Sequence, residues 1–370
     1  MDKKDKIALR ILSKWLKKGN MAMRMRNILP YSGLSYRERE SVAKLLHNIV
    51  RWKRYYDFIL EYHSMDKEPN NYIDLARNKI KIDRKIENVI PKEKFVAIRY
   101  SFSDYIANLL EEKFPELIEY LNSEPDTTLC VNLIKTTRER VLDILFEEGI
   151  RGKSSILETA VITESIARYS YVIRQGLAHV QDEASQLIAK ITVSFGMRIL
   201  DYCCGSGGKT LAMASITRNK AKLYAYDINK DKLLNLKKRM SIYRAKIKIL
   251  WEKPKKKFEV VLVDAPCSGI GASRRNPEAK YISSCREYQI KQLEILKEAS
   301  KVVKKNGYLI YAVCTFTPEE TVEVSKIFLK KFKEFREVEV NYDMLKELDV
   351  GYLTSIPGGD IFYLSVFRRS

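Results

Sequence analysis

The sequence predicts an α/β protein in which a doubly wound, Rossmann-like sheet follows a helical N-terminal part. From about residue 176, β-type runs alternate with helical patterns, which is typical of a doubly wound sheet. A glycine-rich turn follows the first of these strands, as in many ligand-binding sheets of this class. Before residue 125, apolar residues recur at helical spacing only.

Length and composition suggest several globular domains. The chain has 370 residues, of which 45% are hydrophobic and 31% charged. This composition excludes collagen-like, mucin-like and largely disordered chains, and the length favours two or three domains. We predict an all-α domain over residues 1–125, a small α/β module over 126–175 and a catalytic α/β domain over 176–370.

The N-terminal domain is predicted from apolar stripes. The helical stripes are Ile7, Ala8, Ile11, Leu12, Trp15 and Leu16, then Val42, Leu45, Leu46, Ile49 and Val50, with further helical patterns over Tyr72–Ile82 and Ile106–Leu121. Aromatic residues at 52, 55, 56 and 58 interleave with basic ones. They suit either an RNA stacking platform or helix-core packing, and we favour core packing.

The small module combines strands and one helix. The predicted strand Thr128–Ile134 precedes a helix Val141–Glu148 that ends at Gly149, followed by β-type runs over Ile156–Thr163 and Tyr169–Ile173. In the catalytic domain the predicted strands are Arg198–Tyr202, Lys222–Tyr226, Ile247–Leu250, Phe258–Val263, Tyr308–Val313 and Ile361–Phe367. The predicted helices are Leu211–Ile216, Asn229–Met240, Glu287–Lys304 and Pro318–Lys331.

Charge points to a polyanionic partner. The chain has 67 Lys and Arg against 47 Asp and Glu, a net charge of +20, and residues 1–60 carry 15 basic and 5 acidic residues. Such an excess favours nucleic acid through counterion release. No apolar run approaches the length of a membrane span, and the charged N-terminus does not resemble a secretory signal.

Cysteine and histidine usage suggests a reducing compartment and no metal. The six cysteines do not form a disulfide framework, and Cys203, Cys204 and Cys285 suit structural or loop positions. His47, His63 and His179 are scattered without metal-ligand spacing. We therefore expect a cytoplasmic monomer without a metal or a membrane partner.

The turn after Arg198–Tyr202 reads CCGSGGKT and has the features of a cofactor loop. Gly205, Gly207 and Gly208 allow backbone N–H groups to approach a ligand at a helix N-terminus. The Lys209–Thr210 pair does not complete a phosphate-binding loop. That motif needs four residues between its first Gly and its Gly-Lys pair, and CCGSGGKT has only two. Asp227, about 20 residues further on, suits a ribose hydroxyl. These features fit nicotinamide dinucleotide and S-adenosylmethionine equally.

The segment VDAPCSGIGASRRNP, residues 263 to 277, helps to distinguish between these two cofactors. Asp264 and Cys267 follow one strand, and Cys314 follows the next in YAVCTFTPEE. Because ligands bind at the carboxyl ends of strands in such sheets, both thiols are expected to face one pocket. Either cysteine alone would suit a core position, but the pair indicates catalysis.

These residues carry a resemblance to the RsmB/NOP (NSUN-type) family of S-adenosylmethionine-dependent RNA cytosine-C5 methyltransferases. The matching stretches are GLAHVQDEASQLIA (176–189), LDYCCGSGGKT (200–210), YAYDIN (224–229), VDAPCSGIGASRRNPEAKY (263–281), YAVCTFTPEE (311–320) and, more loosely, IPGGDIFYLSVFRR (356–369). The N-terminal part resembles the NusB-like RNA-binding domain of the bacterial rRNA methyltransferase branch, and residues 100–145 resemble the family's small module.

The resemblance implies a role for each site residue. Cys314 would be the nucleophile that adds to C6 of cytosine, Cys267 would assist product release, and Asp264 would lie near N3 and N4 of the base. S-adenosylmethionine would be held by Cys203, Cys204, Gly205, Ser206, Gly207, Gly208, Lys209, Asp227 and Asp264. Arg274, Arg275 and Lys280 would contact RNA, with the two arginines also candidates to promote thiolate formation. The helical domain favours rRNA over tRNA as substrate.

Some residues depart from the family's pattern. Gly205–Ser206 replaces the usual Ala-Pro, Val313 stands where a Thr usually precedes the nucleophile, and Cys130 where Arg is common; Trp251 or Glu252 stands near the expected adenine contact. Three rival functions are a non-catalytic RNA-binding assembly factor, an amino-group methyltransferase and a nicotinamide dehydrogenase. The first has no need of Asp264 with two thiols, the second uses an (Asn/Asp)-Pro-Pro-aromatic turn, and the third has no use for paired thiols.

Overall fold

The computed structural model describes residues 2–79 and 84–370, and in it the chain forms two compact units. One unit comprises Met1–Glu124 together with Ala272–Ser284, and the other comprises Pro125–Gly271 together with Cys285–Ser370. The change at Glu124 lies one residue from the predicted boundary. The inclusion of residues 272–284 in the first unit departs from the prediction, which assigned them to the catalytic domain.

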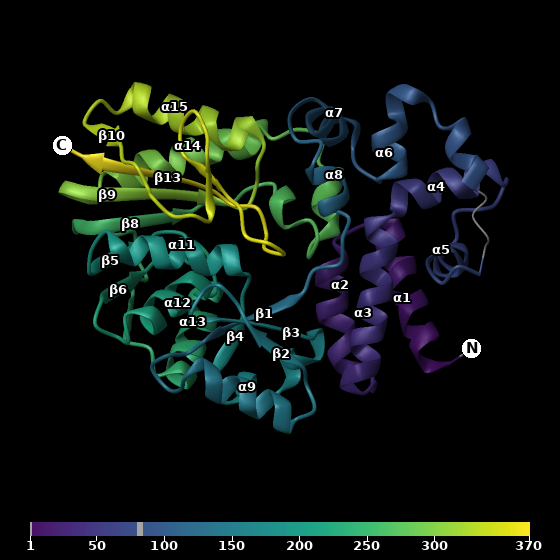
Figure 1. Cartoon of the computed structure of the whole chain (residues 1–370), viewed down its shortest axis with the longest axis horizontal. Helices are drawn as coiled ribbons and strands as arrows, with labels where there is room; N and C mark the ends of the chain where they lie inside the picture. Colours follow the sequence, from purple (N-terminus) through teal and green to yellow (C-terminus); the bar gives the residue numbers. More distant parts are fainter. Residues whose placement is uncertain (1, 80–83) are drawn as a thin grey trace. The chain divides into compact units, whose positions relative to one another are not determined.

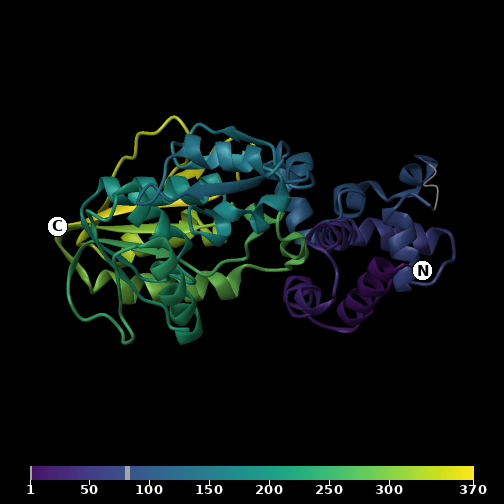
Figure 2. The same cartoon turned by 90° about the horizontal axis from the view of Figure 1, so that it is seen from below.

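The first unit is helical among its described residues (Figure 2, purple and blue). Its α-helices are α1 (Lys3–Lys17), α2 (Met21–Ile28), α3 (Tyr36–Arg51), α4 (Lys53–Tyr62), α5 (Pro69–Ala76), α6 (Phe95–Arg99), α7 (Asp104–Lys113) and α8 (Leu117–Tyr120). Ser35 and Glu38 form a capping box at the start of α3, which satisfies N–H groups that the helix itself leaves without partners. The helix predicted over Tyr72–Ile82 ends at Ala76, and residues 80–83 lie outside the described part.

The aromatic residues between α3 and α4 belong to the helical core. Tyr55 and Tyr56 are each 6% exposed, and Trp52 and Phe58 pack against the same cluster. This supports core packing, which the sequence favoured over an RNA stacking platform.

A small antiparallel sheet opens the second unit. Its strand order is β2-β3-β1-β4, with β1 (Thr127–Val131), β2 (Gly152–Ser154), β3 (Ala160–Thr163) and β4 (Ala178–Val180). Helix α9 (Arg138–Glu147) packs on it, is capped by the side chain of Thr137 and is followed, as predicted, by Gly149, at φ +69°. Because β4 pairs with β1, the small sheet extends past the predicted boundary at residue 175.

The strand predicted over Tyr169–Ile173 is wrong. A 3-10 helix, Ser165–Tyr169, and helix α10 (Tyr171–Arg174) occupy this segment. Alternation over five residues is too short to exclude a helical turn, and Val172 reaches the small core from α10.

The large sheet is doubly wound, as predicted (Figure 1). Its path is β11-β12-β13-β9-β8-β5-β6-β7, and β10 pairs with β13. The strands are β5 (Arg198–Asp201), β6 (Lys222–Ala225), β7 (Ile247–Ile249), β8 (Phe258–Asp264), β9 (Val303–Val313), β10 (Phe335–Glu337), β11 (Leu345–Glu347), β12 (Tyr352–Thr354) and β13 (Tyr363–Arg369). Strands β5 to β9 run parallel, while β13 runs antiparallel to β9.

Helices cover both faces of this sheet (Figure 1). Helices α11 (Glu183–Ser194), α12 (Gly208–Ile216) and α13 (Lys230–Tyr243) lie on one face, and α14 (Arg286–Ser300) and α15 (Val322–Lys331) lie on the other. Strand β8 is nearly all buried, which explains its continuous apolar run. Within the described residues, no helix has the length and apolar character of a membrane span.

Candidate active site at the carboxyl edge of the large sheet

The loop between β5 and α12 is built around two glycines in left-handed conformations. Gly205 has φ +54° and Gly207, the residue before α12, has φ +82°. A Cβ on Gly207 would lie 2.3 Å from Cδ1 of Leu236, so glycine is required there, whereas a Cβ on Gly205 would meet open space. Arg239 donates to the carbonyl of Ser206 at 2.7 Å and holds the loop against α13.

Cys203 and Cys204 lie in this loop, and backbone hydrogen bonds hold Cys204. The N–H of Cys204 donates to the carbonyl of Tyr226, and its own carbonyl accepts from Gly207 N–H. Burial raises the pKa of both thiols above the usual value. They therefore remain protonated at neutral pH and do not compete as nucleophiles.

Asp227 joins the glycine loop to the turn after β6. One carboxylate oxygen accepts the N–H of Gly205 at 2.9 Å, and the other accepts the N–H of Asn229 at 2.8 Å. Each oxygen keeps a second lone pair, so the predicted ribose contact is compatible with this framework role.

Asp201, at the end of β5, is a site residue that our sequence interpretation missed. It is 1% exposed, and its Oδ2 accepts the hydroxyl of Thr210 at 2.7 Å. Its Oδ1 has no hydrogen-bond partner among the described residues. Burial raises the pKa of this carboxyl to about 7. The signal was available, because a carboxylate within LDYCCG follows three strand residues.

Lys209 and Asp264 form an ion pair beside the loop. The lysine Nζ lies 2.8 Å from Oδ2 of Asp264 and 4.5 Å from the centre of the Phe362 ring. The lysine side chain is 8% exposed and the aspartate side chain 32% exposed. The carboxylate is therefore the member of the pair that an external group can reach.

The two predicted thiols lie together. Cys267 follows β8 and Cys314 follows β9, and their sulfur atoms are 3.2 Å apart. The pKa of Cys267 is raised well above its usual value, by its hydrogen bond to Cys314 and by burial. Either sulfur atom can donate the hydrogen bond that joins the pair.

Glu320 ties the two thiol-bearing loops together, a role that we did not expect from the sequence. This fully buried carboxylate accepts the N–H of Ser268 at 2.9 Å and the hydroxyl of Thr317 at 3.1 Å. Gln292 of α14 donates to the same carboxylate at 2.9 Å and to the carbonyl of Pro266 at 3.0 Å. The loops that bear the two cysteines therefore share one buried anchor.

Gly271 joins the loop that bears Cys267 to two neighbouring segments of the same chain, at Cys314 and Ile361. Its N–H donates to the carbonyl of Cys314, and its carbonyl accepts from Ile361, both at 3.0 Å. A Cβ here would lie 2.0 Å from the carbonyl oxygen of Ile361. Any side chain would consequently push the loop away from Cys314.

Two of the three predicted RNA contacts are corrected by the structure. Lys280 is fully buried in the helical unit and donates to the carbonyls of Arg51 and Tyr100 and to Oδ1 of Asn122, at 2.5 to 2.8 Å. Arg274 is 5% exposed and donates to Tyr120 and to the carbonyl of Glu124, each at 3.1 Å. Both cationic side chains donate to acceptors within the protein and are therefore not available to bind RNA phosphates.

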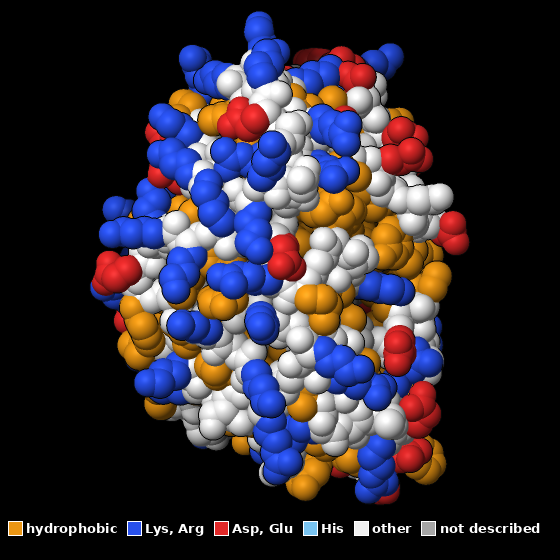
Figure 3. Space-filling view, turned by 90° about the vertical axis from the view of Figure 1, so that its left-hand side faces the viewer, with side chains coloured by type: hydrophobic (Ala, Val, Ile, Leu, Met, Phe, Trp, Pro, Cys, Tyr) orange, Lys and Arg blue, Asp and Glu red, His pale blue; other side chains and the backbone are white. Residues whose placement is uncertain are grey.

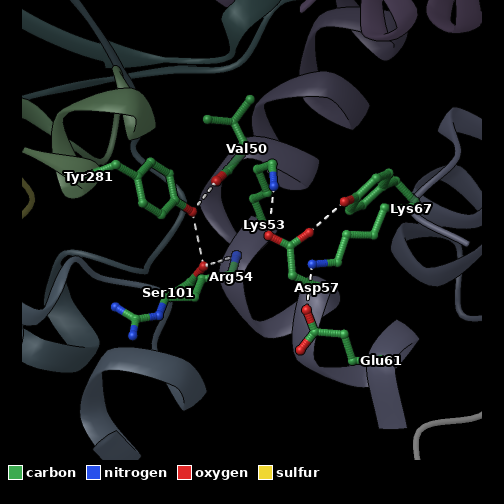
Figure 4. Close-up of polar contacts among 9 residues, drawn as sticks. Val50, Lys53, Arg54, Asp57, Glu61, Lys67, Ser101 and Tyr281 are labelled. Atoms are coloured by element: carbon green, nitrogen blue, oxygen red, sulfur yellow. Dashed lines mark hydrogen bonds and ion pairs between the residues drawn. The ribbon is translucent and has the colours of Figure 1, made fainter. Parts of the chain in front are cut away.

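The surrounding segment is fixed in the same way. The hydroxyl of Tyr281 donates to the carbonyl of Val50 at 2.6 Å and lies 2.9 Å from the hydroxyl of Ser101 (Figure 4). Arg275, half-buried in the same segment, remains a predicted RNA contact.

The remaining sequence expectations concern the edge of the site. Trp251 is 40% exposed after β7, and Glu252 is exposed and pairs with Lys230 at 3.7 Å. Val313 and Cys130 are fully buried. No group of three or more His, Cys, Asp and Glu that could hold a metal occurs in residues 2–79 and 84–370.

Comparison with known proteins identifies sequences and structures that are similar to this chain. Residues 192–368 match the sequence model of a family described as 16S rRNA methyltransferase RsmB/F. The chain is 33% identical over 227 residues to a probable ribosomal RNA small subunit methyltransferase B of Bacillus subtilis, covering 57% of this chain and 51% of that protein. It is 32% identical over 266 residues to a 28S rRNA (cytosine-C(5))-methyltransferase of Mus musculus, covering 65% and 33%.

The alignments thus span about half or less of these two relatives. A solved structure supports the fold over a greater length. The crystal structure of PH0851 has a TM-score of 0.82 with 18% identity, covering 100% of this chain and 99% of that one.

Proposed function

We propose that this chain, whose residues 192–368 match the sequence model of the RsmB/F family of rRNA methyltransferases, transfers a methyl group from S-adenosylmethionine to C5 of a cytosine in RNA. The observation that carries the proposal is the pair of sulfur atoms 3.2 Å apart, on the loops that follow β8 and β9. The printed name of the Mus musculus relative, a cytosine-C(5) methyltransferase, supports the choice of atom. We favour rRNA over tRNA as the substrate, on the resemblance of the helical unit.

The loop after β5 suits the methyl donor. S-adenosylmethionine, when bound, supplies an electrophilic methyl group on a sulfonium cation. Open space above Gly205 and the start of α12 at Gly208 leave backbone N–H groups available to a carboxylate. The orphan oxygen of Asp201 and the carboxylate of Asp227 would accept hydrogen bonds from amino or hydroxyl groups.

Cys314 would start the reaction as a thiolate. Its sulfur forms a bond to C6 of cytosine, and the electrons of the C5–C6 double bond make C5 nucleophilic. C5 then bonds to the methyl carbon as the methyl–sulfonium bond breaks and leaves a neutral thioether, and transfer of the C5 proton to water expels the Cys314 sulfur from C6 as a thiolate. Covalent addition is required because C5 of an unactivated cytosine is a weak nucleophile.

The neighbouring groups would assist at defined atoms. Cys267 keeps its proton, because its raised pKa disfavours the thiolate, and this thiol faces the sulfur that must depart from C6. Asp264 would accept hydrogen bonds from N3–H and the N4 amino group of the adduct, while Lys209 fixes the carboxylate from its other side. Access to both faces of C5 and C6 requires an unstacked base in a loop or unpaired segment.

The experiment compares three variants with the unaltered chain. In Cys267→Ala, adduct formation should continue while release is slowed, so a protein–RNA complex that survives denaturation should accumulate on gels. In Cys314→Ala, both the adduct and methyl transfer should be lost, with binding of S-adenosylmethionine retained. The double variant should resemble Cys314→Ala.

Two results would reject this assignment. Methyl transfer by Cys314→Ala would exclude it as the nucleophile, and an adduct in the double variant would locate the reactive group elsewhere. RNA binding without any methyl transfer by the unaltered chain would favour the assembly-factor alternative.

A further inference from the structure

The turns at the amino edge of the large sheet carry almost all of the chain's excess charge. These turns are residues 195–198, 217–222, 244–248, 253–259, 297–306, 330–336 and 367–370, here called the amino-edge rim. They contain 21 Lys and Arg and 3 Asp and Glu. The whole chain has 67 and 47, which leaves 46 basic and 44 acidic residues elsewhere. A generally lysine-rich composition therefore does not explain the rim.

The sheet topology brings these turns together on one surface. Strands β5 to β9 begin at this edge, and β13, which runs antiparallel to β9, ends there at Arg369. Neighbouring strands lie about 4.8 Å apart, so the six strands from β13 to β7 span roughly 24 Å. Figure 3 views the molecule from this side, and Lys and Arg side chains cover much of the face.

Most of the rim's charge is not neutralised within the protein. Glu298 pairs with Lys253 and Lys301, and Glu259 pairs with Lys304. The exposed side chains of Lys220, Lys222, Lys255, Lys256, Lys305 and Lys333 have no ion-pair partner in the described part of the chain. Cations near the last turns of α13, α14 and α15 complement the helix dipoles, but the lysines of 253–257 lie in a loop where that explanation does not apply.

The composition of the rim favours nucleic acid over a protein partner. Protein interfaces are enriched in aromatic anchors and depleted of lysine, whereas the rim is dominated by lysine. Among its residues, Met197 is the one large hydrophobic side chain that counts as well exposed, at 45%. Such a surface matches the regularly spaced phosphates of a nucleic-acid backbone, which are bound without base readout.

We propose that the amino-edge rim binds the phosphodiester backbone of RNA, at a segment remote from the nucleotide being modified. The inference rests on the proposed function for the identity of the nucleic acid. The cysteines lie at the opposite ends of β8 and β9, and the seven residues of β8 span about 20 Å. A structured RNA would therefore contact the rim and the thiols through different segments, which increases affinity for large RNA and contributes little for short oligonucleotides.

The test is the salt dependence of RNA affinity in two matched variants. The rim variant is Lys255→Gln, Lys256→Gln and Lys305→Gln. The control variant is Lys237→Gln, Lys238→Gln and Lys291→Gln, three exposed lysines of α13 and α14 away from the rim with the same change in charge. The probes are a full-length small-subunit ribosomal RNA transcript and a short single-stranded oligocytidylate.

Each released phosphate contact changes the slope of log K against log salt by about 0.7 to 0.9, so the rim variant should lose about 2 units of slope on the transcript. The control variant should keep the slope of the unaltered chain, and the oligocytidylate should not distinguish the two variants. An unchanged slope for the rim variant, or an equal loss in the control variant, would overturn the proposal.

This binding measurement is independent of catalysis. A chain that shows the rim effect but leaves cytosine unmethylated would retain the RNA surface and reject the proposed activity. If the unaltered chain methylates RNA but the rim variant keeps the same slope, the proposed activity would stand and the proposed RNA surface would be rejected.

Discussion

At the scale of single residues, burial determines whether a titratable side chain such as His179 carries a charge in the folded protein. His179 is 5% exposed, its Nε2 lies 2.9 Å from Oε1 of Gln181, and its ring packs against Tyr243. Burial lowers its pKa from 6.5 to about 3, and the charge of Arg239 adds to the effect. The folded protein therefore holds this imidazole in the neutral form across most of the acidic range.

This pKa has a consequence for stability. Above pH 6.5 neither the folded nor the unfolded chain protonates His179. As pH falls from 6.5 towards 3, only the unfolded chain gains the proton, so the free energy of unfolding falls, by about 5 kcal/mol at most. His179→Gln should remove this loss, so between pH 7 and 4.5 its stability should fall by about 3 kcal/mol less than that of the unaltered chain.

Chemical denaturation at the two pH values checks this expectation. The exposed His63 provides the control through His63→Gln, which should behave as the unaltered chain. Equal losses of stability in His179→Gln and the unaltered chain would contradict the assignment of this titration.

The sequence predicted some site residues well and others badly, for a physical reason. Cys267, Cys314 and Asp264 were expected at one edge because each directly follows a strand of a parallel sheet, and strand order fixes their proximity. Lys280 and Arg274 were misread because a sequence gives a cation's position but not its acceptors. Lysine is rarely fully buried, and the carbonyls that bind Lys280 come from residues far away in the chain.

At the scale of elements, long apolar strands were predictable and short ones were not. The apolar runs of β8 and β9 identified them, although β9 begins at Val303 and not at Tyr308, where its apolar run starts. Strands β10, β11 and β12 have three residues each, too few to show a period. They are strands because β13 and each other supply their hydrogen bonds, which is tertiary information.

The loops after β8 and β9 lead to a prediction about Glu320. Glu320→Ala would leave the N–H of Ser268 and the amide of Gln292 buried without this acceptor, at about 1–3 kcal/mol each. We expect a lower thermal midpoint and, because both thiol loops lose their common anchor, a single-turnover rate that falls further than substrate affinity. Glu320→Gln keeps the size and one acceptor oxygen and should recover part of the rate.

The matched control is Glu323→Ala, since Glu323 is exposed on α15 and accepts one hydrogen bond, from Gln289. Its rate should stay near that of the unaltered chain. A full rate in Glu320→Ala would show that the loops hold the thiols without this carboxylate.

At the scale of the whole molecule, a segment from the second half of the chain belongs to the helical unit. Residues 272–284 follow directly on the loop that bears Cys267 and belong to the unit formed by residues 1–124. Glu278 in this segment accepts hydrogen bonds from the indole of Trp15 at 2.8 Å, from the N–H of Met21 at 3.0 Å and from Asn20. The sequence could not predict that residues 272–284 belong to the helical unit, because the composition of this segment does not differ from that of a surface loop.

The inclusion of residues 272–284 in the helical unit leads to a prediction of where trypsin cleaves the intact protein. Arg274 and Lys280 are buried, so the bonds that follow them should resist cleavage while those after the exposed Lys255 and Lys256 are cut. Glu278→Ala removes one acceptor from three donors at the start of α2 and the end of α1, at a cost of about 2 kcal/mol or more. Cleavage after Arg274 and Lys280 should then rise by at least tenfold, because 1.4 kcal/mol already changes an opening equilibrium by a factor of ten. Mass spectrometry of the fragments measures this, with Glu294→Ala on the exposed side of α14 as the control. If Glu278→Ala were cut at these bonds no faster than the control, the segment would be held by its other contacts, and Glu278 would not be what fastens it to the helical unit.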